Sequence, residues 1–371
     1  MVVHSNSNMK KIGFVIGSMS HGGAERVISI LSNLLSQKYC ITIITFKESP
    51  SFYPLNKSVL LKSCKIKDMD RLKGPIGSIR LNYKIARNIT SIVKEEKIDL
   101  LIGFITSSNV MSIIAARLNR IPCIICERNN PKKEYLSFFW RMSRMLFYPL
   151  ANVLTVQTVA VKEYYLAKKL NSNILVLKNP ISPELSQLVD HTPNRKNIIL
   201  SVGRLDTNKN QKSIIEAFSN LKDPSWSLLL IGDGGMKKEL EAMISRMGQT
   251  ERIQIISGVK DIHNYYNKAK IFVFASNSEG FPNALLEAMH FGLACISTDC
   301  DYGPRELIEN MRNGILISTN ELDELTKSTI ELSGNQQLIA SLGNNAQRES
   351  EKYKAENVIS EWEKTINKLL N

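Results

Sequence analysis

The sequence lacks several features that would assign a protein to a class at once. It contains no run of about 18 apolar residues, so we expect no membrane-spanning helix. Residues 1–11 lack the apolar core of a secretory signal peptide, which predicts a cytoplasmic protein. Cysteine is scarce, with 6 residues among 371, and several lie in apolar runs. This usage is typical of the reduced, buried cysteines of a cytosolic protein.

One CxxC pair is present but does not indicate a metal site. Cys123 and Cys126 lie in a strand-like run over 122–126, where residues three apart point to opposite faces. The two sulfur atoms would therefore not converge on one ion. We expect both residues to be small, buried hydrophobic side chains.

Acidic residues are under-represented in the first half of the chain. Residues 1–190 contain 27 Lys and Arg against 12 Asp and Glu, whereas residues 191–371 contain 21 against 23. A basic surface attracts nucleic acid, an anionic membrane or a pyrophosphate-linked lipid. The sequence carries no recognition-helix, zinc-finger or RNP-type signature. We therefore predict an anionic membrane surface or a lipid as the partner, and no nucleic acid.

Short apolar runs alternate with helix-like stretches along the whole chain, which predicts an α/β protein with parallel sheets. A proline-marked hinge at 179–183 separates two such series, and we expect one doubly wound domain on each side. The predicted strands are 11–16, 41–46, 59–62, 100–105, 123–126, 153–156 and 174–177, then 198–202, 227–231, 253–256, 271–274, 294–297 and 314–317.

The most informative segment follows the predicted strand at 271–274. It places Glu279 in a loop and Glu287 inside a helix that we expect to begin at Pro282 and to stop at Gly292. Free N–H groups at the start of that helix favour the binding of a phosphate or a sugar oxygen next to this loop. Glu279 can accept hydrogen bonds from sugar hydroxyls there, and Glu287 from a ribose diol.

Two cations follow the first strand of the second domain. Arg204 stands at the strand's carboxyl end and Lys209 at the start of the next helix, where an open α/β sheet binds ligands. Together they could neutralise a diphosphate without a metal, although a pair of solvated surface cations would give the same pattern. Gly232 and Gly234 then follow the next strand; they permit either a close backbone approach or a plain turn.

The first domain offers a second glycine-rich turn, at Gly22 and Gly23 before a helix, which is a possible anion cradle. His21 precedes it and is either a ligand contact or a solvated side chain. The G-x-G-x-x-G spacing of dinucleotide-binding proteins is absent, and the second strand ends at 45–47 without the acidic residue that a ribose would need.

Glu127 and Arg128 follow the fifth strand, and they either orient a substrate or form a buried salt bridge. The stretch 132–148 combines cations with aromatic residues and methionines, and we expect one helix. It is either a membrane-interface helix or a core helix with two exposed arginines. In the first case the cations that meet headgroups or a lipid pyrophosphate are Lys132, Lys133, Arg141 and Arg144.

The spacing of Glu279 and Glu287 resembles the E-x7-E signature of retaining glycosyltransferases of family 4, glycosyl transferases group 1, which have the GT-B fold. The resemblance implies two Rossmann-like doubly wound domains facing a central cleft. It implies an acceptor-binding domain at 1–181, completed by a C-terminal helix at 355–371, and a nucleotide-sugar-binding domain at 182–354. Closure about the hinge would exclude water from the reaction.

The resemblance also implies roles for single residues. Arg204 and Lys209 hold the leaving diphosphate, Glu279 holds the donor sugar and Glu287 holds the ribose. The glycine turn at 22–23 approaches the donor phosphate and the acceptor. Residues 127–128 face the acceptor, and Arg128 stands where many relatives have a histidine. Tyr302 replaces the first of two glycines that many relatives carry. The remaining donor-binding positions are Gly203, Gly232, Gly234, Val259, Gly280, Phe281, Pro282, Asn283, Ala284 and Leu285.

The predicted activity is thus transfer of a hexose or N-acetylhexosamine from a UDP-sugar, without a metal, to a lipid-linked glycan or a lipopolysaccharide precursor. The protein would be peripheral on the inner face of the cytoplasmic membrane. Three alternatives remain. A metal-dependent GT-A enzyme would use a D-x-D at 68–70 or 299–301; the other two are a sugar-nucleotide epimerase and a non-catalytic nucleotide-sugar-binding protein.

Overall fold

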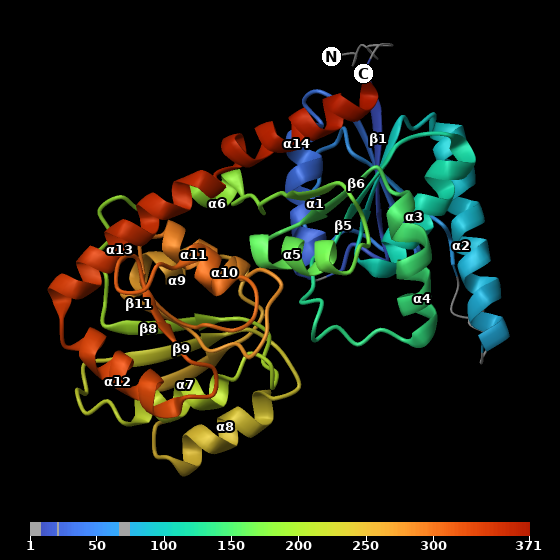
Figure 1. The fold of residues 1–371 in the computed structure, drawn as a ribbon. Coiled ribbons are helices and arrows are strands. Elements are labelled where there is room, and N and C mark those ends of the chain that lie inside the picture. The colour runs from blue at the N-terminus through green and yellow to red at the C-terminus, as the bar shows by residue number, and fades with distance from the viewer. Residues whose placement is uncertain (1–8, 21, 67–74) are drawn as a thin grey trace. The chain divides into compact units, whose positions relative to one another are not determined.

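The computed structural model describes residues 9–20, 22–66 and 75–371. The chain divides into two compact units, shown in Figure 1. Unit 1 consists of the residues up to Pro180 together with Ala355–Asn371, and unit 2 consists of Ile181–Lys354. Each unit contains one parallel β-sheet.

The sheet of unit 1 has seven strands in the order β3-β2-β1-β4-β5-β6-β7. The order reverses between the adjacent strands β1 and β4. The strands are β1 (Lys11–Ile16), β2 (Cys40–Thr45), β3 (Leu60–Ser63), β4 (Leu100–Phe104), β5 (Cys123–Cys126), β6 (Val153–Val156) and β7 (Ile174–Val176). The helices are α1 (Gly23–Leu35), α2 (Pro75–Glu96), α3 (Thr106–Asn119), α4 (Phe138–Phe147), the 3-10 helix η2 (Tyr148–Leu150), α5 (Val159–Ala167) and α14 (Ala355–Leu370).

The last helix of the chain belongs to the core of unit 1. Val358, Trp362 and Ile366 of α14 are buried together with side chains of α1, β1 and β4. In Figure 1, α14 (red) accordingly runs beside α1, whereas α2, α3 and α4 form a separate group. Helices thus flank this sheet in two groups, as expected for a doubly wound domain.

The sheet of unit 2 has six strands in the order β10-β9-β8-β11-β12-β13, which reverses between β8 and β11. The strands are β8 (Ile198–Val202), β9 (Ser227–Ile231), β10 (Ile253–Ile256), β11 (Ile271–Phe274), β12 (Ala294–Thr298) and β13 (Ile315–Ile317). The helices are α6 (Pro183–Ser186), α7 (Gln211–Ser219), α8 (Lys237–Arg246), α9 (His263–Lys268), α10 (Asn283–His290), α11 (Pro304–Leu307), α12 (Leu322–Ser333), α13 (Gln336–Ser350) and the 3-10 helix η3 (Glu351–Tyr353).

The predicted strands are all present, each within one residue of its expected ends. Two helix predictions need correction. Pro282 caps α10 with φ −87° and ψ 78° and is not its first residue, although Gly292 ends the helix as expected, with φ +72°. The predicted helix over 132–148 is shorter, because residues 132–137 form a loop and α4 begins at Phe138.

Candidate functional site

The carboxyl ends of β8 and β11 bring two of the predicted site residues of unit 2 together. These strands are adjacent at the point where the strand order reverses, which is where open α/β sheets bind ligands. Lys209 Nζ, from the loop after β8, lies 2.5 Å from Glu279 Oε1, from the loop after β11. The Lys209 ammonium also lies 5.0 Å from the centroid of the Phe274 ring. Both charged side chains are largely buried, with exposed fractions of 20% and 12%.

Hydrogen bonds to backbone carbonyl groups hold the two loops together. Asn277 N donates to Asn208 O at 2.8 Å, and Asn208 Nδ2 donates to Ser278 O at 2.9 Å. Asn277 Nδ2 donates to Thr207 O at 3.1 Å. The Lys209–Glu279 pair therefore rests on a fixed backbone and does not depend on two loose surface loops.

Arg204 differs from Lys209 because its side chain is 74% exposed. Its Nε lies 2.8 Å from Asp206 Oδ2, and Asp206 Oδ1 accepts from the backbone N of Lys209 at 2.9 Å. The sequence reasoning missed Asp206, although an aspartate three residues before Lys209 is a recognisable turn signal. An exposed ion pair is weak, so a phosphate can compete for the Arg204 guanidinium.

The glycines of the predicted nucleotide loop cannot carry a side chain, because a neighbouring loop packs directly against them. Gly232 has φ +153°, and a Cβ there would lie 1.9 Å from Gly203 O. A Cβ at Gly234 would lie 2.2 Å from Leu205 O. These glycines allow the loops after β8 and β9 to touch. Val259, which follows Gly258 (φ +67°) after β10, is partly buried.

The segment 280–287 surrounds the start of α10. Phe281 and Leu285 are buried in the core of unit 2, so their backbone groups and not their side chains are available to a ligand. The loop carrying Tyr302 packs on this segment, because a Cβ at Gly303 would lie 2.7 Å from Pro282 Cδ. Tyr302 itself has φ +60°, the left-handed conformation that favours glycine.

Glu287 is buried on α10, with 6% of its surface exposed. Tyr266 OH of α9 donates to Glu287 Oε2 at 3.2 Å. Tyr266, which the sequence reasoning did not single out, is itself 0% exposed.

In unit 1 the glycine turn caps α1. Gly22 has an extended backbone with φ −173°, and a Cβ there would lie 2.2 Å from Glu25 Oε2. Gly23 is the first residue of the helix. His21 lies outside the residues that the structure describes.

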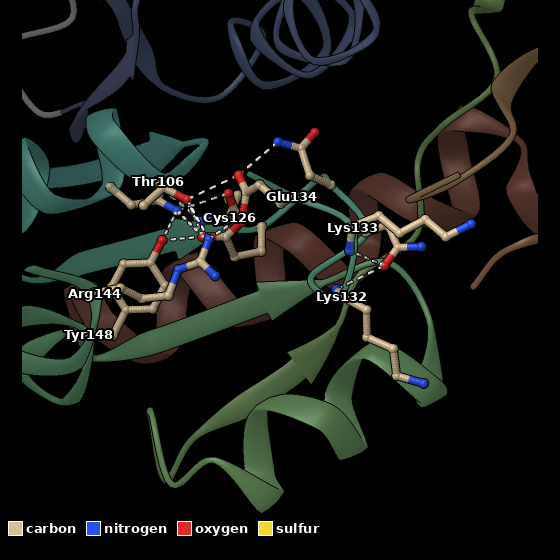
Figure 2. Close-up of polar contacts among 11 residues, drawn as sticks. Thr106, Cys126, Lys132, Lys133, Glu134, Arg144 and Tyr148 are labelled. Carbon is tan, nitrogen blue, oxygen red and sulfur yellow. Dashed lines mark hydrogen bonds and ion pairs between the residues drawn. The ribbon is translucent and has the colours of Figure 1, made fainter. Parts of the chain in front are cut away.

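The residues after β5 belong to a buried polar cluster, shown in Figure 2. Glu127, 1% exposed, accepts hydrogen bonds at Oε1 from Thr106 Oγ1 at 3.2 Å, from Asn109 Nδ2 at 3.4 Å and from Tyr148 OH. Arg144 Nη2 lies 3.4 Å from the same oxygen and also pairs with Glu134. Burial raises the pKa of Glu127, and the Arg144 guanidinium opposes this rise.

Arg128 is buried apart from this cluster. Its Nη1 donates to Asn179 Oδ1 at 2.8 Å, and its guanidinium carbon lies 5.0 Å from the Phe104 ring centroid and 5.9 Å from that of Trp362. Burial lowers its pKa. The expected alternative of a buried salt bridge at these positions is correct for Glu127, but the partner is Arg144 and not Arg128.

The predicted membrane cations divide into two kinds. Lys132, Lys133 and Arg141 are exposed, and the backbone N atoms of the two lysines donate to Asn130 Oδ1 at 2.9 and 3.3 Å (Figure 2). The prediction that Arg144 meets headgroups is wrong, because its side chain is 9% exposed and paired inside unit 1.

The outer face of α4 is apolar apart from Arg141. Phe138 is 74% exposed, Met145 61% and Leu146 68%, and Tyr135 in the preceding loop is 96% exposed. No helix among the described residues has the length and apolar character to span a bilayer.

The D-x-D and CxxC motifs are the last of the predicted features, and the described residues form no metal-binding cluster around them. Within 9–20, 22–66 and 75–371, no group of three or more His, Cys, Asp or Glu side chains is placed to hold an ion. Asp299 of one D-x-D pairs with Arg305, whereas residues 68–70 lie outside the described part of the chain. Cys123 and Cys126 are buried and unbridged, as predicted, and burial raises the pKa of both thiols.

The chain is similar to a family model, to relatives of known sequence and to solved structures. Residues 188–349 match the model of the family described as glycosyl transferases group 1. A GalNAc-alpha-(1->4)-GalNAc-alpha-(1->3)-diNAcBac-PP-undecaprenol alpha-1,4-N-acetyl-D-galactosaminyltransferase of Campylobacter jejuni is 29% identical, over 98% of this chain and 100% of the relative. The amylovoran biosynthesis glycosyltransferase AmsD of Erwinia amylovora is 28% identical, over 97% and 100%.

Among solved structures, HepE of Anabaena in complex with UDP superimposes with a TM-score of 0.78 at 19% identity, over 97% of this chain and 100% of that chain. Sucrose-phosphate synthase of Thermosynechococcus elongatus gives 0.79 at 15% identity, over 97% and 99%. At such identities the likeness concerns the fold, and the predicted GT-B fold is confirmed.

Proposed function

We propose that this chain, a glycosyltransferase whose residues 188–349 match the family of glycosyl transferases group 1, retains anomeric configuration and uses a UDP-sugar. The donated group would be a hexose or an N-acetylhexosamine, and the acceptor a hydroxyl of a lipid-linked glycan. The relative from Campylobacter is named for an acceptor on undecaprenyl diphosphate, and HepE was solved with UDP. The observation that carries the proposal is the Lys209–Glu279 pair between β8 and β11.

The proposed donor site assigns one task to each charged group. The Lys209 ammonium and the Arg204 guanidinium bind the diphosphate, Glu279 accepts from the sugar hydroxyls and Glu287 accepts from the ribose. As the sugar–phosphate bond breaks, the electron pair passes to the phosphate oxygen, and the two cations stabilise this charge more strongly in the transition state than in the bound donor.

The acceptor oxygen forms its bond to the anomeric carbon on the face that the diphosphate leaves, so the configuration is retained. Its proton passes to the departing phosphate oxygen. No metal is required in this scheme, because two cations already balance the diphosphate. The acceptor would be bound by unit 1, near the turn at Gly22 and Gly23 and the loop after β5. Glu127 and Arg128, both buried, would act there by shaping the loop.

We also propose that the protein associates with the cytoplasmic side of the inner membrane; the apolar face of α4 supports the membrane contact. Exposed Phe138, Met145 and Leu146 would enter the interface, with Lys132 and Arg141 near anionic headgroups. Flotation of the protein with vesicles of anionic lipid measures its binding to a membrane. Met145→Glu should reduce binding, whereas Ile330→Glu, which changes a residue 45% exposed on α12 of unit 2, should not. Equal binding by all three proteins would refute the assignment.

The alternatives are not favoured. The two parallel-sheet units exclude the single-sheet GT-A arrangement. The whole-length relatives with stated activities are transferases, which favours neither an epimerase nor a binding protein.

The proposal is tested by nucleotide release from UDP-, GDP- and ADP-sugars with chelator present, with and without an undecaprenyl-diphosphate-linked glycan extract. We expect UDP release that depends on the extract. Lys209→Ala should lower kcat/KM by about 100-fold or more, as loss of a group that stabilises transition-state charge does. Lys212→Ala, which removes a nearby exposed lysine paired with Glu239, should leave it unchanged. Unchanged turnover in Lys209→Ala would refute the site.

A further inference from the structure

The buried carboxylate of Glu287 is held by a side chain from another helix. Tyr266 OH lies 3.2 Å from Glu287 Oε2 and 3.5 Å from Ala284 O, both on α10. A single hydroxyl proton serves one acceptor at a time, and the carboxylate is the nearer and the charged one. The hydrogen bond therefore fixes one oxygen of Glu287 and with it the orientation of the carboxylate plane.

Tyr266 has little freedom of its own. Its ring stacks on Phe291 at 5.2 Å with an interplanar angle of 30° and lies 6.2 Å from Phe272. A buried ring packed on two sides does not change rotamer without displacing its neighbours. The hydroxyl thus reaches Glu287 from a rigid position.

Arg195 ties the backbones of α9 and α10 at their C-terminal ends. Its Nη1 donates to Tyr266 O at 3.0 Å and to Ala269 O at 2.6 Å, and its Nη2 donates to Phe291 O. These carbonyls lie where a helix leaves acceptors unsatisfied and where a cation is favoured by the helix dipole. One guanidinium therefore sets the distance between the helix that carries Tyr266 and the helix that carries Glu287.

We propose that Tyr266 is a positioning residue that orients Glu287 toward the ribose diol of the donor, with Arg195 holding the two helices in register. The inference rests on the proposed function, because it takes Glu287 as the ribose-binding group. It goes beyond that function by assigning the selection of ribose over deoxyribose to a tyrosine that need not touch the donor.

The experiment measures the affinities of UDP, 2′-deoxy-UDP and 3′-deoxy-UDP by calorimetry for four proteins. These are the wild type, Tyr266→Phe, Tyr265→Phe and Glu287→Gln. Tyr265 is the neighbouring tyrosine on α9 and is the matched control, because the same hydroxyl is removed from the same helix. Thermal unfolding of each protein establishes that it is folded.

In the wild type, UDP should bind about tenfold or more tightly than the weaker-binding deoxy analogue, as expected for a hydrogen bond to a charged group. Tyr266→Phe should reduce this ratio to about twofold or less, like Glu287→Gln, while Tyr265→Phe keeps the wild-type ratio. A merely structural role would lower the unfolding temperature of Tyr266→Phe and leave the ratio intact, which would overturn the inference.

Failure of the proposed function gives a different result. If the wild type does not distinguish UDP from either analogue, or if Glu287→Gln keeps the wild-type ratio, Glu287 does not bind the ribose. Both the site assignment and the inference about Tyr266 are then overturned. If Glu287→Gln loses the ratio and Tyr266→Phe keeps it, the inference alone fails.

Discussion

Replacing Arg144 by methionine should destabilise unit 1 strongly. Arg144 is the cation beside two carboxylates, Glu127 and Glu134, whose side chains are 1% and 10% exposed. Methionine fills a similar volume but leaves both carboxylates without their charge partner. Removing one member of a buried ion pair costs about 3–5 kcal/mol, because the remaining charge stays desolvated. We therefore expect Arg144→Met to reduce the free energy of unfolding by about that amount at pH 8.

The loss should depend on pH in a definite direction. Burial already raises the pKa of Glu127 above its ordinary value in the folded protein, and Arg144 opposes this rise. Without Arg144 the pKa rises further. When a carboxyl group has a higher pKa in the folded state than in the unfolded state, the protein becomes less stable as the pH increases from the unfolded-state pKa to the folded-state pKa. Arg144→Met should thus be less destabilised at pH 5, where Glu127 is protonated more readily, than at pH 8.

Urea unfolding followed by tryptophan fluorescence measures this in a Trp226→Phe background. Trp226 is the tryptophan of unit 2, so the remaining signal comes from Trp140 and Trp362 of unit 1. Arg141→Met is the matched control, because Arg141 is exposed on the same helix and its loss should cost less than about 0.5 kcal/mol. A loss below about 1 kcal/mol at pH 8, or an equal loss at both pH values, would refute the reasoning about the buried cluster.

Two further predictions concern unit 2. Gly234→Ala should destabilise it by about 2–4 kcal/mol, since the new Cβ would meet Leu205 O at 2.2 Å. Gly235→Ala, whose Cβ would meet nothing within 4 Å, should be nearly neutral, and Trp226 fluorescence during urea unfolding compares the two. Glu279→Gln should lower kcat/KM for transfer by about 100-fold without changing the unfolding temperature by more than a few degrees; wild-type turnover would remove Glu279 from the site.

The meeting of Lys209 and Glu279 was predictable because both residues follow strand ends. Strands buried on both faces are continuous apolar runs, and the sequence therefore shows where each one stops. Lys209 and Glu279 are 70 positions apart. They meet because β8 and β11 are neighbours at the reversal of strand order, a property of the fold class that a βαβ pattern already implies.

The partners of these residues were not predictable in the same way. Tyr266 is one of two consecutive tyrosines on a short helix, and no pattern in the sequence distinguishes the one whose hydroxyl reaches Glu287. Asp206 carried a turn signal, but its pairing with Arg204 depends on side-chain conformation. Contacts between side chains of different helices and strands depend on the final packing. The hydrophobic periodicity and the amino-acid composition of the sequence do not specify that packing.

The helix α4 shows why the environment of residues 132–148 was only partly predictable. The sequence predicts a helix here that carries both apolar and charged residues, and such an amphipathic helix normally buries its apolar stripe. Here Ser143 and Arg144 face inward, and Met142, Met145 and Leu146 face outward. This inversion follows from Glu127. Leaving its buried carboxylate without a cation costs more free energy than leaving the methionines exposed to water. An exposed apolar face of this kind is costly in water and marks a surface that meets another phase or partner. Because we propose that the enzyme acts on a lipid-linked acceptor, we propose the membrane surface as that phase. The buried cluster that turns Arg144 inward is also what turns the methionines outward.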